Sequence, residues 1–262
     1  MKLTILGSGT SIIKKDRLAP GYLVELNSGE SFLFDCGGTV AQRFANIKFD
    51  YLGLDHIFIS HPHPDHLGGL ISFLHGIVLK SMYFGCLGKK RRKKKLLLHG
   101  YPGFVKAYKS LRKLIFSESI ETYPIKVMEY KNQKVRYPGF IIKTAIVPHA
   151  EKLFKSLALR LEADGKIFFY SGDTRYSKQL VKLAENADLA LIDSSGLGAG
   201  LGEKGYHITP EGAGKVAQEA RVKKLIPTHH YDVKPAKQIL QEAKKYFSGE
   251  IVLAEDLMVI KI

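Results

Sequence analysis

Residues 60–70 read Ser60-His61-Pro62-His63-Pro64-Asp65-His66-Leu67-Gly68-Gly69-Leu70 and follow directly after the apolar run Ile57-Phe58-Ile59. This order predicts a buried strand that ends in a polar loop, where α/β proteins place their chemistry. Imidazole and carboxylate are ligands of Zn²⁺ and of its first-row neighbours. His61 and His63 are spaced to bind one ion, whereas Asp65 and His66 follow the turn and can face a second. The stretch therefore predicts a metal site at the end of a strand.

The composition limits the class of protein. The chain has 262 residues, 45% of them hydrophobic, and shows no composition break that would mark a linker. No apolar run approaches the roughly 20 residues that span a bilayer, and Gly7-Ser8-Gly9 interrupts the N-terminus too early for a secretory signal. The two cysteines, Cys36 and Cys86, give no disulfide framework, which favours a reducing compartment. We expect a single cytoplasmic domain over residues 1–262.

The chain carries an excess of positive charge, with a formal net charge of +15 from 40 Lys and Arg against 25 Asp and Glu. Such an excess favours a polyanionic partner, RNA or DNA before an acidic membrane surface, and no membrane partner is expected. Seven consecutive cations occupy Lys89–Lys95. Each phosphate that they contact would release counterions and make binding sensitive to salt. We expect this run to contact an RNA backbone; a plain exposed loop is the alternative.

Further candidate ligands stand just beyond other predicted strands. His149 follows one strand and can be the third histidine of the first ion. Asp173 follows another strand and the tight Gly172, so its carboxylate can bridge both ions. The last strand before the C-terminal helix ends in the pair His229-His230, either of which could reach the site. Scattered positions thus add to the early cluster.

Four local predictions concern other parts of the chain. Residues 196–205 are rich in glycine and are expected to form a flexible loop that closes over substrate. A helix is expected to start after Thr209, which can act as its N-cap. Pro210 would be its first residue, and the charge of Glu211 in the first turn is favourable to the helix dipole. Asp35 can support the metal site through a ligand or can simply cap its own turn. Ile251–Ile262 is expected to form one closing strand.

The pattern His-x-His-x-Asp-His followed by Leu-Gly-Gly-Leu resembles the signature of the metallo-β-lactamase superfamily. Two further strings make the chain similar to its ribonuclease Z branch: Leu6-Gly7-Ser8-Gly9 and Tyr170-Ser171-Gly172-Asp173-Thr174. The resemblance implies an α/β fold, the metallo-β-lactamase-type αββα sandwich of two mixed β-sheets flanked by helices, and it maps the last ligand to His229. Collected, the candidates are His61, His63 and His149 on one ion, Asp65, His66 and His229 on the other, and Asp173 between them.

Such a constellation favours hydrolysis. Two ions about 3.5–4 Å apart can hold a hydroxide and stabilise both the attacking and the leaving oxygen of an in-line displacement. Phosphodiesters fit this arrangement best, although an amide, lactone or thioester could be attacked in the same way. Zn²⁺ suits the ligands, with Mn²⁺ and Fe²⁺ as alternatives. By the resemblance, His207 donates a proton to the leaving oxygen or stabilises charge on the phosphate, and Asp193 orients it. The predicted catalytic residues are Asp65, His207 and Asp193.

One departure from the ribonuclease Z pattern bears on the substrate. Ribonuclease Z carries a long arm that grips tRNA, often between the positions that match His149 and Asp173, whereas residues 150–172 hold a single predicted hairpin. We therefore expect a metal-dependent, ribonuclease Z-like phosphodiesterase that cleaves RNA or nucleotide phosphodiesters, with pre-tRNA as one candidate. Two alternatives stay open: a hydrolase of the same fold for a cyclic nucleotide, lactone or thioester, and a non-catalytic, metal-stabilised RNA-binding protein. Since ribonuclease Z-like enzymes are commonly dimers, a homodimer is a further expectation.

Overall fold

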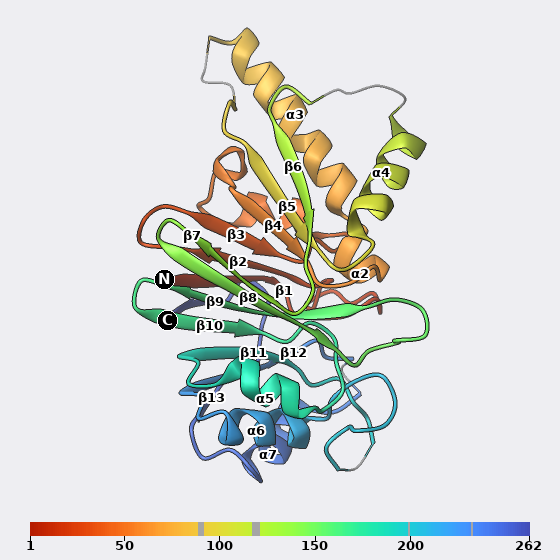
Figure 1. Cartoon of the computed structure of the whole chain (residues 1–262), viewed down its shortest axis with the longest axis vertical. Coiled ribbons are helices and arrows are strands. Elements are labelled where there is room, and N and C mark those ends of the chain that lie inside the picture. The colour runs from red at the N-terminus through yellow and green to blue at the C-terminus, as the bar shows by residue number, and fades with distance from the viewer. Residues whose placement is uncertain (89–91, 117–120, 199, 232) are drawn as a thin grey trace.

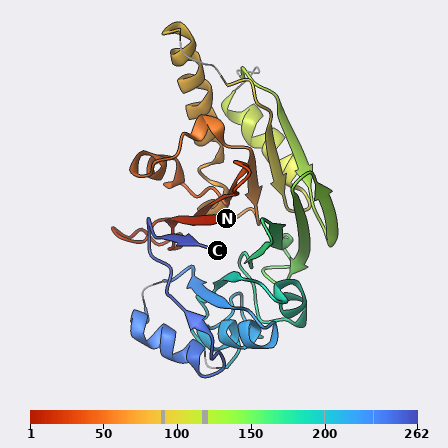
Figure 2. The same ribbon diagram turned by 90° about the vertical axis from the view of Figure 1, so that its left-hand side faces the viewer.

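The computed structural model describes residues 1–88, 92–116, 121–198, 200–231 and 233–262. Two mixed β-sheets pack face to face and helices cover their outer faces, so the layers follow the order helix, sheet, sheet, helix (Figure 1). The predicted αββα sandwich is therefore confirmed. Both termini lie close together (Figure 2), because the last strand pairs with the first.

The first sheet is antiparallel at one edge and parallel at the other. Within the described residues its strands are, in spatial order, β14 (Val259–Lys261), β1 (Lys2–Gly7), β2 (Gly21–Glu25), β3 (Ser31–Phe34), β4 (His56–Ile59), β5 (Leu96–Gly100) and β6 (Ile125–Glu129). Its outer side carries α1 (Val40–Arg43), the 3₁₀ turns η1 (Phe44–Asn46) and η2 (Tyr51–Gly53), α3 (Leu70–Cys86) and α4 (Phe104–Ile115) (Figure 1).

The second sheet places its parallel strands together. Its described strands are, in spatial order, β13 (Glu250–Ile251), β12 (Lys224–Thr228), β11 (Leu189–Asp193), β10 (Lys166–Tyr170), β9 (Ser156–Ala163), β8 (Phe140–Val147) and β7 (Gln133–Tyr137). Its outer side carries α5 (Lys178–Ala184), α6 (Pro210–Glu219) and α7 (Ala236–Lys244). As predicted, α6 begins after Thr209, whose side chain accepts a hydrogen bond from the amide of Gly212 at 3.1 Å.

Residues 251–262 do not form one strand, so that prediction was wrong. β13 pairs with β12 in the second sheet, whereas β14 pairs with β1 in the first. Between them Leu257 adopts a φ of 66° and its amide donates to the carbonyl of Ile5 at 2.6 Å. The segment crosses from one sheet to the other, which a period-two pattern cannot reveal.

Aromatic rings from the two sheets meet in the middle of the sandwich. The ring centroids of Phe32 and Phe140 lie 5.0 Å apart, and those of Phe34 and Phe168 lie 5.3 Å apart. All four side chains are buried. Burying each of them contributes roughly 1.5–3 kcal/mol, so the two sheets share one hydrophobic core, at whose edge the candidate ligands lie.

By length and composition, one helical stretch among the described residues, Pro64–Cys86, could cross a membrane. It joins the short helix α2 (Pro64–Leu67) to α3, and half of its apolar window (50%) is buried in the fold. Phe73 of α3 stacks on Phe44 with ring centroids 5.1 Å apart, inside the core. Packing against the first sheet therefore accounts for the apolar character of this stretch.

The basic run Lys89–Lys95 is more than an exposed loop. Residues 89–91 lie outside the described residues, but Arg92 is buried and donates from its guanidinium to the carbonyls of Leu52 and Lys95. The run directly precedes β5, which is parallel to β4, and the candidate ligands follow the other end of β4. The described part of the run, residues 92–95, therefore lies at the end of the first sheet opposite the predicted metal site.

His56 and His99 belong to a buried chain of hydrogen bonds between the sheets. Nε2 of His56 lies 3.0 Å from Glu30 and its Nδ1 lies 2.9 Å from Nε2 of His99. Nδ1 of His99 lies 2.9 Å from the hydroxyl of Tyr130, which bonds to Tyr137. In the neutral form each ring offers one donor and one acceptor, which satisfies the whole chain. Burial, the largest cause, lowers the pKa of both histidines.

We expect this network to make the protein less stable in acid. The unfolded histidines bind protons near pH 6.5 and the folded ones do not, so the free energy of unfolding falls as the pH drops below about 6.5. Each unmatched proton adds a slope of about 1.4 kcal/mol per pH unit. Urea unfolding of the wild type and of a His99→Leu variant with the same metal content, from pH 7.5 to pH 5, measures this slope. The variant should be less stable at pH 7.5 but show a flatter profile; an unchanged slope would contradict the assignment.

Candidate metal centre

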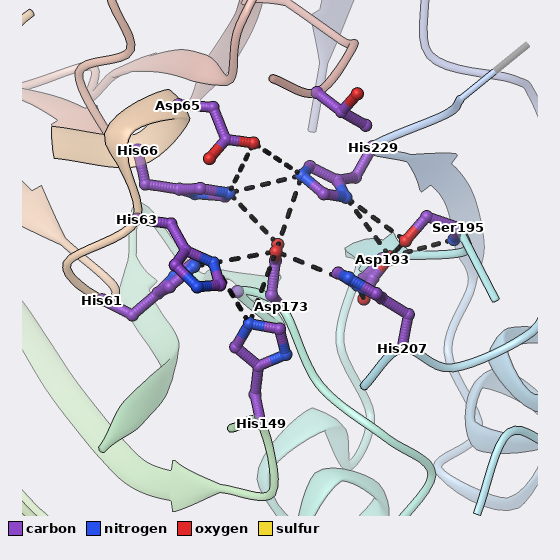
Figure 3. A network of polar contacts seen from close by, with 12 residues as sticks. His61, His63, Asp65, His66, His149, Asp173, Asp193, Ser195, His207 and His229 are labelled. Atoms are coloured by element: carbon purple, nitrogen blue, oxygen red, sulfur yellow. Dashed lines mark hydrogen bonds and ion pairs between the residues drawn. The ribbon is translucent and has the colours of Figure 1, made fainter. Parts of the chain in front are cut away.

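The candidate ligands gather at one edge of the sandwich, where several strands end (Figure 3). β10, β11 and β12 are parallel neighbours, so their carboxyl ends lie side by side. His61 and His63 follow β4, Asp65 and His66 lie on α2, His149 follows β8, Asp173 follows β10 and His229 follows β12. The scaffold thus brings together side chains from 61 to 229 in the sequence, and all seven predicted ligands meet.

Their donor atoms form two close groups. One contains His61, His63, His149 and Asp173; the other contains Asp65, His66 and His229; within each group the donor atoms lie within 4.8 Å of one another. Asp173 also faces the second group, since one of its oxygens is 3.3 Å from Nε2 of His66 and the other is 3.7 Å from Nε2 of His61. Asp173 therefore lies between the two groups of donor atoms.

The spacing between donor atoms suits a bound metal. Nε2 of His149 lies 3.4 Å from Nδ1 of His63. Nε2 of His229 lies 3.3 Å from Nε2 of His66 and 3.3 Å from a carboxylate oxygen of Asp65. Ligand atoms about 2.0–2.1 Å from a tetrahedral Zn²⁺ are about 3.3–3.4 Å from one another. Both groups therefore fit a divalent ion.

Four buried histidines are each held by the ring nitrogen that faces away from the centre. The contacts of Nδ1 are His61 to the Ser60 hydroxyl at 3.0 Å, His66 to Asp35 at 2.7 Å, His149 to the carbonyl of Tyr206 at 2.8 Å and His229 to the Ser195 hydroxyl at 3.3 Å. This arrangement is typical of histidines that bind metal. Nε2 of His61 is buried and has no hydrogen-bond partner within the described part of the chain, as expected of a nitrogen whose lone pair binds an ion.

The electrostatics also differ between the two groups. Burial lowers the pKa of His61, His63 and His149, which leaves these rings neutral at pH 7, the form that binds metal. Burial opposes charge on His66, but the carboxylates of Asp173 and Asp35 raise its pKa well above the usual value. This excess of carboxylate around His66 favours a cation there.

Asp35 supports the second group from behind. Its carboxylate accepts hydrogen bonds from the amide and hydroxyl of Ser60 at 2.7 and 2.8 Å and from the hydroxyl of Tyr170 at 2.5 Å, besides contacting His66. The residue is fully buried and has a φ of 57°, a conformation that costs a non-glycine residue about 1 kcal/mol or more. Of the two roles considered for Asp35, the geometry favours support of the metal site.

His207 lies on the other side of Asp173 from Asp65 (Figure 3). Its Nδ1 is 2.9 Å from Asp193 and its Nε2 is 3.4 Å from the hydroxyl of Tyr231. Burial disfavours the charged ring, but the Asp193 carboxylate raises the pKa of His207 to about 9. His207 is therefore protonated at pH 7. Its Nδ1 lies 3.9 Å from a carboxylate oxygen of Asp173, whereas its Nε2 faces the hydroxyl of Tyr231.

A family model described as anti-Pycsar protein Apyc1 matches residues 1–252. The chain belongs to this family. A ribonuclease Z of Archaeoglobus fulgidus is 30% identical to it, in an alignment that covers 100% of this chain and 97% of that relative. The Apyc1-family chain is therefore a metal-dependent hydrolase of the ribonuclease Z-like kind, as the sequence predicted.

Solved structures agree on the fold of this Apyc1-family chain. The metallo-β-lactamase fold protein YhfI from Bacillus subtilis has a TM-score of 0.82 at 22% identity and covers 99% of this chain and 98% of its own. Human tRNase Z, short form, has a TM-score of 0.79 at 23% identity and covers 100% and 99%. The predicted metallo-β-lactamase-type fold is thus confirmed, and the His and Asp groups indicate that divalent metals bind at its edge.

Some features of the Apyc1-family site were not predictable from the sequence. His229 reaches the centre, whereas Nε2 of the adjacent His230 lies 3.1 Å from the carbonyl of Pro227, and burial lowers its pKa to about 3. The roles of Ser195, of the Tyr206 carbonyl and of Tyr231 were missed. Ser195 follows the acidic end of β11, which was a usable signal; the contacts of the two tyrosines depend on how the loop before α6 folds.

Proposed function

We propose that the chain hydrolyses phosphodiesters at a centre of two divalent ions, with Zn²⁺ as the metal that suits the ligands. The proposed ligands are His61, His63 and His149 for one ion, Asp65, His66 and His229 for the other, and Asp173 for both. The observation that carries this proposal is the packing of these donors at tetrahedral ligand spacing beside a protonated His207. Residues 1–262 would act as one hydrolase domain, since both sheets contribute ligands to the same centre.

The chain's own residues supply orientation and a proton. When bound, the ions would lower the pKa of water and neutralise charge on the phosphate. Asp193 fixes the ring of His207 through Nδ1, so Nε2 donates a proton to the leaving oxygen. Asp193 also accepts from the hydroxyl of Ser195, which contacts His229. One carboxylate therefore positions the proton donor and, through a serine, a metal ligand.

RNA is the first candidate substrate. The formal net charge of +15 favours a polyanion, and curated relatives named ribonuclease Z are similar over their whole length. Residues 92–95 of the basic run lie away from the centre, at the opposite end of the first sheet, so an RNA that contacted both would have to extend along that sheet.

A small nucleotide diester, such as a cyclic nucleotide, is the second candidate. Residues 150–172 hold only β9, β10 and their connections, with no protruding arm. The alignment with the Archaeoglobus fulgidus ribonuclease Z runs over 315 positions against 262 residues in this chain, so that relative has segments with no counterpart here. A shorter scaffold leaves less surface to grip a long RNA.

Metal analysis coupled to a substrate panel tests the proposal. The panel consists of pre-tRNA, bis-p-nitrophenyl phosphate, a cyclic nucleotide and a lactone. We expect two ions per chain and turnover of phosphodiesters but not of the lactone. Metal-loaded protein that binds RNA but turns over none of the four would favour the RNA-binding alternative and overturn the proposal.

Charge reversal in the basic run should separate the two candidate substrates. Lys93 and Lys95 are exposed, unlike Arg92, so Lys93→Glu with Lys95→Glu should weaken RNA binding without unfolding the protein. A plot of log affinity against log salt concentration has a negative slope, and its magnitude should decrease by about 0.7–0.9 for each lost phosphate contact. Turnover of bis-p-nitrophenyl phosphate should stay unchanged. The control is the same reversal at Lys237 and Lys244, exposed on α7; equal effects of both pairs would count against a specific RNA contact.

A further inference from the structure

Two cavities flank the candidate metal centre. The larger, about 590 Å³, is lined by His207, Tyr231 and residues of the segments 195–198 and 200–206. The smaller, about 260 Å³, opens at Asp65 and lies beneath residues 10–19. Asp65 and His207 are on opposite sides of Asp173 (Figure 3), so a substrate held at the centre meets one cavity on each side.

We propose that the cavity at His207 receives the nucleoside on the leaving side of the scissile phosphate, and that the cavity at Asp65 receives the retained nucleoside. This inference rests on the proposed phosphodiesterase function and assigns its two product halves. Water forms the new P–O bond and loses one proton to solvent, while the P–O bond to the leaving group breaks. The leaving oxygen takes the proton of His207, which solvent then restores, and the phosphate stays with the retained half.

The orientation of His207 decides which cavity takes which half. Its Nδ1 is held by Asp193, so only Nε2 can protonate the leaving oxygen. Nε2 lies 3.4 Å from the hydroxyl of Tyr231, which lines the larger cavity. The leaving oxygen must come within hydrogen-bond reach of this nitrogen. The group attached to that oxygen then continues into the larger cavity.

The larger cavity is a built pocket that suits a nucleoside. Its volume lies within the range of small-molecule sites, about 300–1,000 Å³. Tyr206 and Tyr231 supply aromatic rings at its wall, on which a base of any identity can stack. The wall is anchored, because the carbonyl of Tyr206 holds Nδ1 of His149 at 2.8 Å and the amide of Tyr176 donates to Gly202 at 3.1 Å.

Each cavity is lined by a glycine at which a side chain can be added without strain. Gly198 lines the larger cavity and Gly38 lines the smaller. Both are exposed and neither has a positive φ, and a Cβ added to either meets no atom within 4 Å. Gly53, outside both cavities, has the same properties and provides a matched control. A leucine at each position thus tests one space at a time.

Two diesters distinguish the halves. Uridylyl-(3′→5′)-uridine has a nucleoside on both sides, whereas uridine 5′-(p-nitrophenyl phosphate) releases a small nitrophenolate and retains the nucleoside. We expect Gly198→Leu to raise KM for the dinucleotide about tenfold and to change KM for the nitrophenyl ester less than twofold. Gly38→Leu should raise KM for both, and Gly53→Leu for neither. Tyr206→Ala, which keeps the carbonyl that holds His149, should raise KM for the dinucleotide alone, and it provides a second reading if Gly198→Leu folds poorly.

Equal effects of Gly198→Leu and Tyr206→Ala on both diesters, or no effect on either, would overturn the assignment of the cavities. A reversed pattern, in which Gly38→Leu impairs the dinucleotide alone, would overturn it as well. Failure of the proposed function looks different, because metal-loaded wild-type protein would then hydrolyse neither diester.

Discussion

Replacing Asp173 by asparagine should remove at least one of two bound ions and lower kcat/KM for phosphodiesters by about a thousandfold, equivalent to about 4 kcal/mol of transition-state stabilisation. The Asp173 carboxylate lies 3.3 Å from Nε2 of His66, 3.5 Å from Nε2 of His229 and 3.7 Å from Nε2 of His61. Burial opposes ionisation of this carboxyl, but the neighbouring histidines, His66 among them, hold its pKa well below the usual range, so the group is ionised. An amide has the same shape but no charge, and its nitrogen cannot bind a cation.

Metal content and kinetics of the purified Asp173→Asn variant provide the measurement. Asp50→Asn is the control, because Asp50 is a largely exposed aspartate on the outer side of the first sheet. Thermal unfolding separates lost metal from lost fold: in chelator the variant and the wild type should melt alike, and added Zn²⁺ should stabilise the wild type more. A variant that keeps two ions and turnover within tenfold of the wild type would contradict the bridging role.

The regular elements were largely predictable because their determinants are local. α6 begins after the predicted N-cap Thr209, and residues 150–172 hold the single predicted hairpin, β9–β10. The error at the C-terminus has a different cause, since β13 and β14 belong to different sheets. Which sheet a short apolar segment joins depends on long-range pairing, and no local pattern specifies it.

The gathering of the seven candidate ligands was predictable because five of them follow an apolar strand, where a sheet directs side chains to a common edge, and Asp65 and His66 lie on α2, just after His63. The choice between His229 and His230 was not predictable from spacing alone. It depends on the positive φ of His229, 62°, which turns its ring to the centre. The basic run shows the same limit, because counting charges did not reveal that Arg92 is directed inward to the carbonyl of Leu52.

The loss of kcat caused by His207→Ala should depend on the leaving group of the substrate. We expect kcat for uridylyl-(3′→5′)-uridine to fall about 10³-fold, within the usual range of about 10²–10⁴ for a lost general acid. For bis-p-nitrophenyl phosphate it should fall less than tenfold, because nitrophenolate leaves without a proton. Asp193→Asn should act in the same direction: the Asp193 charge raises the pKa of His207 to about 9, so its loss moves the alkaline limb of the pH–rate profile to lower pH.

The same variant decides between two readings of the site. Asp173, Asp193, His207 and His229 also place donor atoms within 4.8 Å of one another, so His207 could instead bind an ion. In that case His207→Ala would lose metal and slow both substrates equally. If His207 is a proton donor, the His207→Ala variant should keep both ions. Only the substrate with the poor leaving group, uridylyl-(3′→5′)-uridine, should then be hydrolysed more slowly. His75→Ala on α3, outside the centre, controls for the general loss of an imidazole. If both substrates slow equally and an ion is lost, His207 is a metal ligand and not the general acid.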